Sequence, residues 1–180
     1  MSVGGPSRPY EIVVFGATGF TGQLVAQYLA ENAPRDLRWA IAGRNRGKLE
    51  EVRRTINRPE LPILSASSDD EDSLLAMARS TRVVLTTVGP YAEHGEPVVR
   101  NAIDGGADYV DITGEPAFVD LTLSRYDERA QKAGVRIVSC CGFDSIPHDL
   151  GAYFAVRALA QLATNEPIKV EGLVRSRGTF

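Results

Sequence analysis

The sequence predicts an α/β fold in which helices cover both faces of a doubly wound parallel sheet. Three observations predict it. Short β-branched runs alternate with stretches whose apolar residues recur at helical spacing, which is typical of repeated β-α-β units. The runs are apolar without alternation, as expected when both faces of a sheet are buried. A glycine-rich turn links the first run to the first helical stretch, as is usual in this class of fold.

Six strands and five connecting helices are expected, in the spatial order 3-2-1-4-5-6. The expected strands are Tyr10–Phe15, Trp39–Ala42, Leu61–Leu64, Val83–Val88, Tyr109–Ile112 and Val135–Cys140. Gly105-Gly106 and Gly134 stand where two helices should end, because glycine adopts the left-handed C-terminal turn at little cost. Pro97 and Pro116 fall near two expected helix starts, where a missing N–H does no harm.

Composition excludes several classes of protein. The 180 residues carry 20 basic and 23 acidic side chains, a net charge of -3, so no nucleic-acid partner is expected. No apolar run reaches the length of a membrane span, and the N-terminus lacks the pattern of a secretory signal. Adjacent Cys140 and Cys141 fit a reducing compartment. We therefore expect a cytoplasmic protein, at most peripheral to a membrane.

The strongest functional signal is the glycine-rich turn GATGFTG. In such a turn Gly16 permits the tight bend, Gly19 lets the backbone approach a pyrophosphate, and Gly22 lets helix and strand pack closely. The diphosphate would lie at the positive end of the helix. Thr18 replaces the second glycine of the common G-x-G-x-x-G spacing, and the alternative is a turn that binds nothing. The residues predicted to bind the cofactor here are Gly16, Ala17, Thr18, Gly19, Phe20, Thr21 and Gly22.

The end of the second expected strand indicates which dinucleotide is bound. An NAD-preferring domain usually has an acidic residue there, which accepts hydrogen bonds from the ribose. This chain has Arg44 and Asn45 instead, and a guanidinium can fork onto a 2′-phosphate. We expect NADP(H) to be preferred over NAD(H). The alternative is that Arg44, like Arg46, is an ordinary solvated charge. The segment 67–70 is expected to cap the third helix, with a secondary contact to adenine.

Three more segments follow expected strands, where doubly wound sheets bind ligands. Val88, Gly89, Pro90 and Tyr91 are expected beside the nicotinamide. Glu115 is either an acid of the site or a helix-terminal residue favoured by the dipole. Asp144 and His148 form the only pair here that resembles acid–base chemistry, and helix capping explains Asp144 equally well.

Several common active-site patterns are absent. Each tyrosine lacks a lysine four residues later, so the Tyr-x-x-x-Lys pair of short-chain dehydrogenases is missing. The two histidines and two cysteines show no zinc-ligand spacing, and no G-x-S-x-G motif is present. Cys140 and Cys141 are expected to be packed and inert. The sequence assigns no catalytic residue and no metal site.

The segments FGATGFTG, AGRN, TTVGPY, YVDITGE and CCGFDSIPHDLG, in this order, resemble those of the saccharopine dehydrogenase-like oxidoreductases, and among them most closely the mycobacterial trans-acting enoyl reductases. The resemblance implies a Rossmann domain over residues 1–163. It also implies that residues 164–180, with a strand at Ile168–Val174, open a truncated second α/β domain for the substrate. A helix over Asp149–Ala163 is expected to close the sheet.

The resemblance also implies a function. The intact protein would reduce an α,β-unsaturated acyl thioester with NADPH during polyketide or cell-envelope lipid synthesis, the acyl chain being presented by a polyketide synthase carrier domain. One alternative is an imine or amino-acid oxidoreductase like saccharopine dehydrogenase. Another is a dinucleotide-binding or redox-sensing module without turnover. An apolar face left uncovered by the missing domain predicts self-association into a homo-oligomer.

Overall fold

The computed structural model describes residues 8–162 and 169–175. The strands are β1 (Tyr10–Phe15), β2 (Trp39–Gly43), β3 (Ile63–Ser65), β4 (Thr81–Thr86), β5 (Asp108–Asp111) and β6 (Ile137–Val138). The helices are α1 (Phe20–Asn32), α2 (Arg46–Thr55), α3 (Glu71–Ser80), α4 (Tyr91–Gly105), α5 (Pro116–Ala133) and α6 (Ile146–Leu162). Strands and helices therefore alternate along the described chain, as the sequence predicts.

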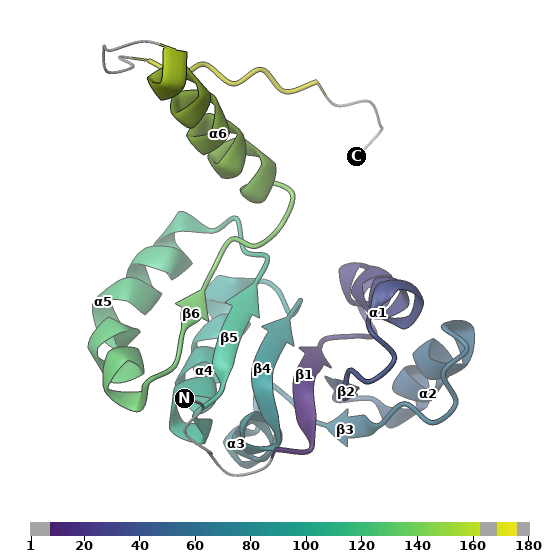
Figure 1. Cartoon of the computed structure of the whole chain (residues 1–180). Helices are drawn as coiled ribbons and strands as arrows, with labels where there is room; N and C mark the ends of the chain where they lie inside the picture. Colours follow the sequence, from purple (N-terminus) through teal and green to yellow (C-terminus); the bar gives the residue numbers. More distant parts are fainter. Residues whose placement is uncertain (1–7, 163–168, 176–180) are drawn as a thin grey trace.

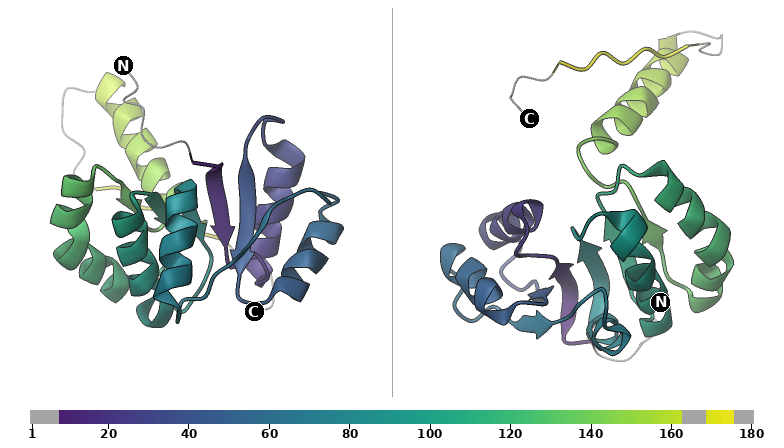
Figure 2. Two further views of the ribbon diagram at one scale, coloured as in Figure 1. Left: turned by 90° about the horizontal axis from the view of Figure 1, so that it is seen from below. Right: turned by 180° about the vertical axis from the view of Figure 1, so that it is seen from behind.

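The six strands form one parallel sheet in the order β3-β2-β1-β4-β5-β6, which confirms the predicted topology. α1 and α2 cover one face of the sheet, and α3, α4 and α5 cover the other (Figures 1 and 2). The connection after β1 leads to β2 on one side of β1, whereas the connection after β4 leads to β5 on the other side. Their divergence opens a crevice at the carboxyl end of β1, where such sheets bind ligands.

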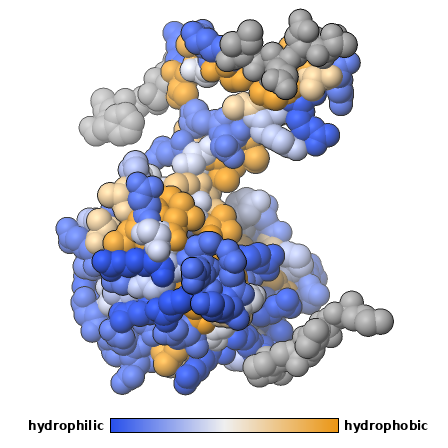
Figure 3. Space-filling model, turned by 90° about the vertical axis from the view of Figure 1, so that its left-hand side faces the viewer, coloured by the Kyte–Doolittle hydropathy of each residue, from blue (hydrophilic) through white to orange (hydrophobic). Residues whose placement is uncertain are grey.

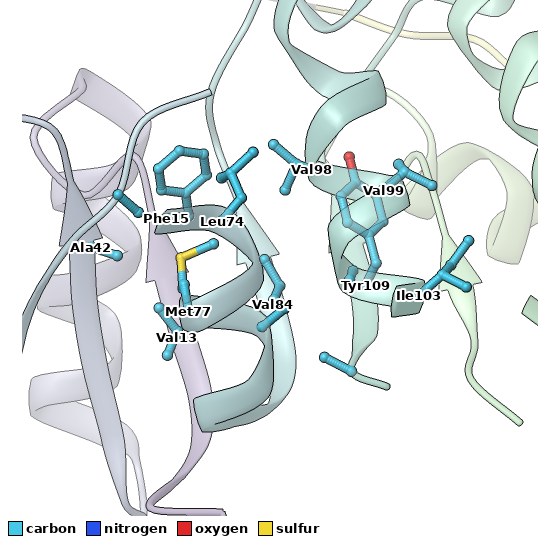
Figure 4. Close-up of a cluster of buried hydrophobic side chains, with 14 of the residues drawn as sticks. Val13, Phe15, Ala42, Leu74, Met77, Val84, Val98, Val99, Ile103 and Tyr109 are labelled. Carbon is cyan, nitrogen blue, oxygen red and sulfur yellow. The ribbon is translucent and has the colours of Figure 1, made fainter. Parts of the chain in front are cut away.

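Each face of the sheet has its own apolar core. Val13 and Phe15 of β1 point toward α3 and α4, where they belong to a cluster with Leu74 and Met77 (Figure 4). Val14 points to the opposite face and packs in the cluster of α1 and α2. Alternate residues of one central strand thus anchor both layers, which holds the carboxyl end of β1 in a rigid setting.

Helix ends follow the sequence in part. Gly106 and Gly134 cap α4 and α5 with φ of 69° and 68°, as predicted, and Pro116 begins α5. The expectation for Pro97 is wrong, because α4 begins at Tyr91 and Pro97 lies inside the helix. Pro90, which follows Gly89 through a cis peptide bond, is the N-cap residue of α4.

The C-terminal part departs most from prediction. β6 is confined to two residues, because Ser139 and Cys140 turn toward the side chain of Asp111 instead of continuing the ladder. α6 is present but does not close the sheet, since it projects away from the α/β body (Figure 1). Of the strand expected over 168–174, Ile168 lies outside the described residues and 169–174 are not a strand; no described strand pairs with them.

α6 exposes several large apolar side chains. They include Ile146, Leu150, Tyr153, Phe154 and Leu159, and Phe154 is 75% exposed. Apolar surface gathers where α6 meets the body and continues along the helix (Figure 3). Ile146, Leu150, Tyr153 and Phe154 follow the i, i+4, i+7, i+8 spacing of one apolar stripe, and this stripe is exposed in the structure. Within the described residues no helix has the length and apolarity to cross a bilayer.

Candidate dinucleotide-binding site

A pocket of about 240 Å³ lies in the crevice at the carboxyl ends of β1 to β4. Its walls come from four successive strand-to-helix connections, so residues far apart in sequence meet there. The predicted residues that it brings together are Gly16, Thr18, Gly19, Arg44, Val88 and Gly89. Ser67 and Ser68, from the segment expected to make a secondary contact to adenine, also line the pocket, and the other lining residues are Phe15, Gly43, Ala66, Thr87 and His94.

The glycine-rich turn is packed so closely that two of its glycines cannot be replaced. Gly16 has a φ of +88°, and a Cβ there would lie 2.7 Å from Cγ2 of Val88. At Gly22 a Cβ would lie 2.1 Å from the carbonyl oxygen of Gly16. The Thr87 hydroxyl also donates to the Gly16 carbonyl, at 3.3 Å. The turn is therefore held tightly between the segment that follows β4 and the start of α1.

The N-terminus of α1 is open to an anion, unlike those of its neighbours. Its N-cap residue, Gly19, offers no capping side chain, and its first turn has no acidic residue. By contrast, Asn45 caps α2, and Asp70 caps α3 as predicted. Since free N–H groups and the helix dipole favour negative charge, α1 is the helix of this crevice that offers both to a diphosphate.

Arg44 lies at the edge of the pocket with its side chain exposed. Within the described part of the chain, no hydrogen bond or ion pair engages its guanidinium, whereas Arg46 pairs with Glu50 at 3.2 Å. Among residues 8–162 and 169–175, those that line the pocket include no carboxylate. The described wall of the pocket therefore presents the unpaired guanidinium of Arg44 without a competing anion, a combination suited to a phosphate.

The remaining residues of the glycine-rich turn lie around the pocket and not in its wall. Ala17 and Gly22 are buried, Thr21 is half-buried, and the ring of Phe20 is 84% exposed on α1. Asn45 is occupied by its cap, since Oδ1 accepts from the backbone N–H of Lys48 at 3.0 Å. These positions shape the turn and the helix starts that border the pocket.

Tyr91 is placed differently from the expectation that it flanks the nicotinamide. Its ring is 6% exposed and packs against Phe118, and its hydroxyl donates to the carbonyl of Thr86 at 3.1 Å. The side chain points into the core because Tyr91 is the first residue of α4, on the helix face toward the sheet. Burial raises the pKa of Tyr91 to about 12, so it is a neutral structural group. Pro90 is exposed beside it.

Glu115 is the N-cap residue of α5, but its side chain caps a different helix. Its two carboxylate oxygens accept from the backbone N–H groups of Tyr91 and Ala92, both at 2.8 Å. Those groups open α4, so the loop after β5 caps the helix after β4. Of the two roles left open by the sequence, the helix-terminal one is the one seen.

A buried carboxylate at the end of β5 was missed by the sequence reasoning. Asp111 is 1% exposed. It accepts from the Tyr109 hydroxyl at 2.8 Å, from the backbone N–H groups of Thr113 and Cys140 at 3.0 and 2.9 Å, and from the Ser139 hydroxyl at 3.1 Å. Four donors around one carboxylate fasten β5 to β6 from inside the protein.

The segment after β6 shows no assembled acid–base pair. Asp144 and His148 are both exposed, and among the described residues no hydrogen bond or ion pair joins them. The His148 ring meets Phe143 edge-on at 6.2 Å. Cys140 and Cys141 are half-buried; burial, with nearby Asp111, raises the pKa of the Cys141 thiol, which disfavours the reactive thiolate.

His94 is the second residue that sequence reasoning missed. It lies in the first turns of α4 and lines the pocket. A signal was available, because His94 precedes buried Val98 by four residues and so shares the helix face that turns inward.

The fold and the pocket define this protein as a dinucleotide-binding Rossmann domain. Residues 12–138 match the family described as the saccharopine dehydrogenase NADP binding domain, and the chain belongs to that family. Its cofactor is therefore NADP, in agreement with the absence of an acid after β2.

Two relatives align with most of the length of this chain. It is 40% identical over 171 residues to the trans-acting enoyl reductase of Mycobacterium tuberculosis, covering 94% of this chain and 41% of that protein. It is 45% identical over 152 residues to the lipid droplet localized protein of Caenorhabditis elegans, covering 81% of this chain and 36% of that protein. The chain thus spans about two fifths of the length of these relatives.

The fold is shared with a solved structure at lower identity. Saccharopine dehydrogenase (L-Glu forming) from Saccharomyces cerevisiae superposes with a TM-score of 0.65 at 20% identity, covering 84% of this chain and 31% of that one. This likeness establishes the Rossmann-like architecture.

Proposed function

We propose that this chain is the cofactor domain of an NADPH-dependent oxidoreductase of the trans-acting enoyl reductase type. The observation that carries the proposal is the pocket beside the open N-terminus of α1, whose wall, as far as the structure describes it, has an unpaired Arg44 and no carboxylate. The name of the mycobacterial relative, which aligns with 94% of this chain, supports the reaction class.

In this proposal each part of the crevice has its own task. The first turn of α1 and the backbone of Gly16 to Gly19 hold the diphosphate. Arg44 holds the 2′-phosphate of the adenosine half. Val88 and Gly89 border the path toward the nicotinamide half, and Tyr91 supports that loop from the core through its bond to Thr86. The remaining predicted residues, Ala17, Phe20, Thr21, Gly22, Asn45 and Pro90, fix the shape of the turns.

Bound NADPH would supply a hydride to the β-carbon of an α,β-unsaturated acyl thioester, with a proton added at the α-carbon. We propose that a polyketide synthase carrier domain presents the acyl chain. We also propose that a second domain, which follows α6 in the intact protein, forms the substrate site. Copies of the protein would associate through the apolar surface of α6. A location at a lipid surface within the cytoplasm is part of the same proposal, supported by the name of the nematode relative.

A titration of NADPH and NADH tests the cofactor site. Wild type is expected to bind NADPH at least about tenfold more tightly, which corresponds to roughly 1.4 kcal/mol. Arg44→Ala should remove this preference by weakening NADPH alone. Arg46→Ala is the matched control, since Arg46 pairs with Glu50 and does not line the pocket. Equal binding of both nucleotides by wild type would show that Arg44 is only a solvated charge.

The reaction is tested on the intact protein that contains this domain. NADPH oxidation is measured with an enoyl thioester carried either on coenzyme A or on a carrier domain. Turnover that requires the carrier-bound substrate supports the proposal. Cofactor binding without turnover of any enoyl thioester contradicts the reaction class and leaves the cofactor site standing.

A further inference from the structure

His94 lies in the pocket on the side away from Arg44. Arg44 follows β2, while His94 belongs to the helix that follows β4, and β1 lies between these two strands in the sheet. Both residues line the same cavity. The glycine-rich turn after β1 therefore forms the floor between a guanidinium on one wall and an imidazole on the other.

The position of His94 is fixed by the frame of α4. Its backbone N–H donates to the carbonyl of Pro90 at 3.0 Å, and the Glu115 carboxylate accepts from the first two N–H groups of the helix, those of Tyr91 and Ala92. The imidazole itself is half-buried and has no hydrogen-bond partner among residues 8–162 and 169–175. A rigid backbone thus presents an unengaged planar ring to the cavity.

The geometry of a nucleotide dictates what must occupy this cavity. In NADP the 2′-phosphate and the adenine are attached to neighbouring carbons of one ribose. If Arg44 holds the phosphate, the base lies within the same cavity. A cavity of about 240 Å³ has room for a purine ring and not for the whole dinucleotide. The polar walls there are short hydroxyls, Ser67, Ser68 and Thr87. Two rings line the cavity, and Phe15 is 2% exposed and packs in the core, so half-buried His94 is the ring that can face the base.

We infer that His94 is a positioning residue for the cofactor, which stacks on the adenine ring of NADPH opposite the phosphate contact of Arg44. The inference rests on the proposed function and gives a role to one residue in the wall of that site. Stacking on an aromatic ring acts on the base, which NADPH and NADH share. Removal of the His94 ring therefore weakens the binding of NADPH and of NADH by the same factor, whereas removal of the Arg44 side chain weakens the binding of NADPH alone.

The test measures the affinities of both nucleotides for His94→Ala, His94→Phe and His94→Gln. His94→Ala is expected to weaken NADPH and NADH equally, by about tenfold. His94→Phe keeps a ring and should remain within about threefold of wild type, while His94→Gln, polar but not aromatic, should behave as alanine. Glu93→Gln, an exposed neighbour on the same turn that does not line the pocket, should stay within about twofold.

Three outcomes overturn the inference, and they are distinguishable. Unchanged affinities in His94→Ala and His94→Gln show that the ring does not touch the base. A loss confined to NADPH that phenylalanine does not restore shows a contact to the phosphate instead. If the wild-type protein binds neither nucleotide, the proposed function is overturned together with the inference. Because His94 is only half-buried, thermal unfolding of each variant checks that the fold is intact, and the comparison of Phe with Gln holds if the alanine variant fails to fold.

Discussion

The Glu115 carboxylate accepts a hydrogen bond from the backbone N–H of Tyr91 at 2.8 Å, across 24 positions of sequence. Its other oxygen accepts from Ala92 at the same distance. Glu115 thereby ties the loop after β5 to the start of α4, which carries His94 and follows the loop that borders the pocket. One side chain thus couples two strand-to-helix connections.

Glu115→Ala is expected to reduce the free energy of unfolding by about 1–2 kcal/mol, since two N–H groups lose a charged acceptor at a helix start. Glu115→Gln should cost less, because the amide keeps one acceptor oxygen. Urea denaturation measures both. The control is Glu128→Ala, which removes only an exposed ion pair to Lys132 and should cost at most about 0.5 kcal/mol. Equal urea midpoints for Glu115→Ala and wild type would rule out this cap.

The environment of Asp111 predicts an asymmetry between two substitutions. Oδ1 faces two backbone N–H groups, of Thr113 and Cys140, whereas Oδ2 faces two hydroxyls, of Tyr109 and Ser139. Hydroxyls can accept as well as donate, so the amide nitrogen of Asp111→Asn can replace Oδ2 at a cost of about 1 kcal/mol. Asp111→Ala leaves all four donors without the carboxylate and should cost about 3 kcal/mol or more. Chemical denaturation that finds equal losses would contradict this network.

Substitution by alanine should have very different effects on stability at two glycines of the glycine-rich turn. At Gly22 a Cβ would lie 2.1 Å from the Gly16 carbonyl oxygen, but at Gly19 the nearest such contact is 3.4 Å. Gly22→Ala must therefore separate α1 from β1 and is expected to lower stability by about 3 kcal/mol or more. Gly19→Ala should cost less than about 1 kcal/mol. Thermal unfolding of the Gly22→Ala and Gly19→Ala variants measures the difference in stability. Similar melting temperatures for the two variants would show that the turn can relax.

Buried tyrosines predict a loss of stability at alkaline pH. Burial raises the pKa of Tyr91 to about 12, and burial with nearby Asp111 raises that of Tyr109 well above its usual value. The folded state therefore holds these protons more tightly than the unfolded chain. This stabilisation is fully present below pH 10 and is lost as pH rises through about 12.

Tyr91→Phe removes one of these groups. The free energy of unfolding of wild type should fall with a slope that is steeper, by up to about 1.4 kcal/mol per pH unit, than that of Tyr91→Phe between pH 10 and 12. Denaturation curves at several pH values measure the slope. Tyr28→Phe, on the exposed side of α1, should leave it unchanged. Identical slopes for wild type and Tyr91→Phe would mean that Tyr91 ionises freely in the folded protein.

The sequence predicts those features of this protein that depend on local pattern. The strand order, the glycine turn after β1 and the glycine caps at Gly106 and Gly134 follow from periodicity and from backbone conformations that favour glycine. The Rossmann class follows because these signals agree with one another.

The features that could not be predicted depend on contacts between distant segments. Glu115 finds its partners in α4, and Asp111 draws Cys140 out of β6; neither pairing leaves a local pattern. Tyr91 points inward because α4 begins there, and a shift of one residue in the helix start turns a side chain by about 100°. The direction of α6 was also beyond prediction, since the apolar stripe of Ile146, Leu150, Tyr153 and Phe154 favours packing on the sheet, whereas these side chains are exposed.

The uncovered start of α1 has a consequence for how this domain responds when its site fills. Its first N–H groups have neither a capping side chain nor an acidic neighbour, so without a ligand they depend on water as acceptor. A bound diphosphate replaces that water and becomes the missing cap of the helix. The first turn of α1 should therefore be the segment whose amide hydrogens gain most protection from exchange when a nucleotide binds, while the starts of α2 and α3, already closed by Asn45 and Asp70, change little.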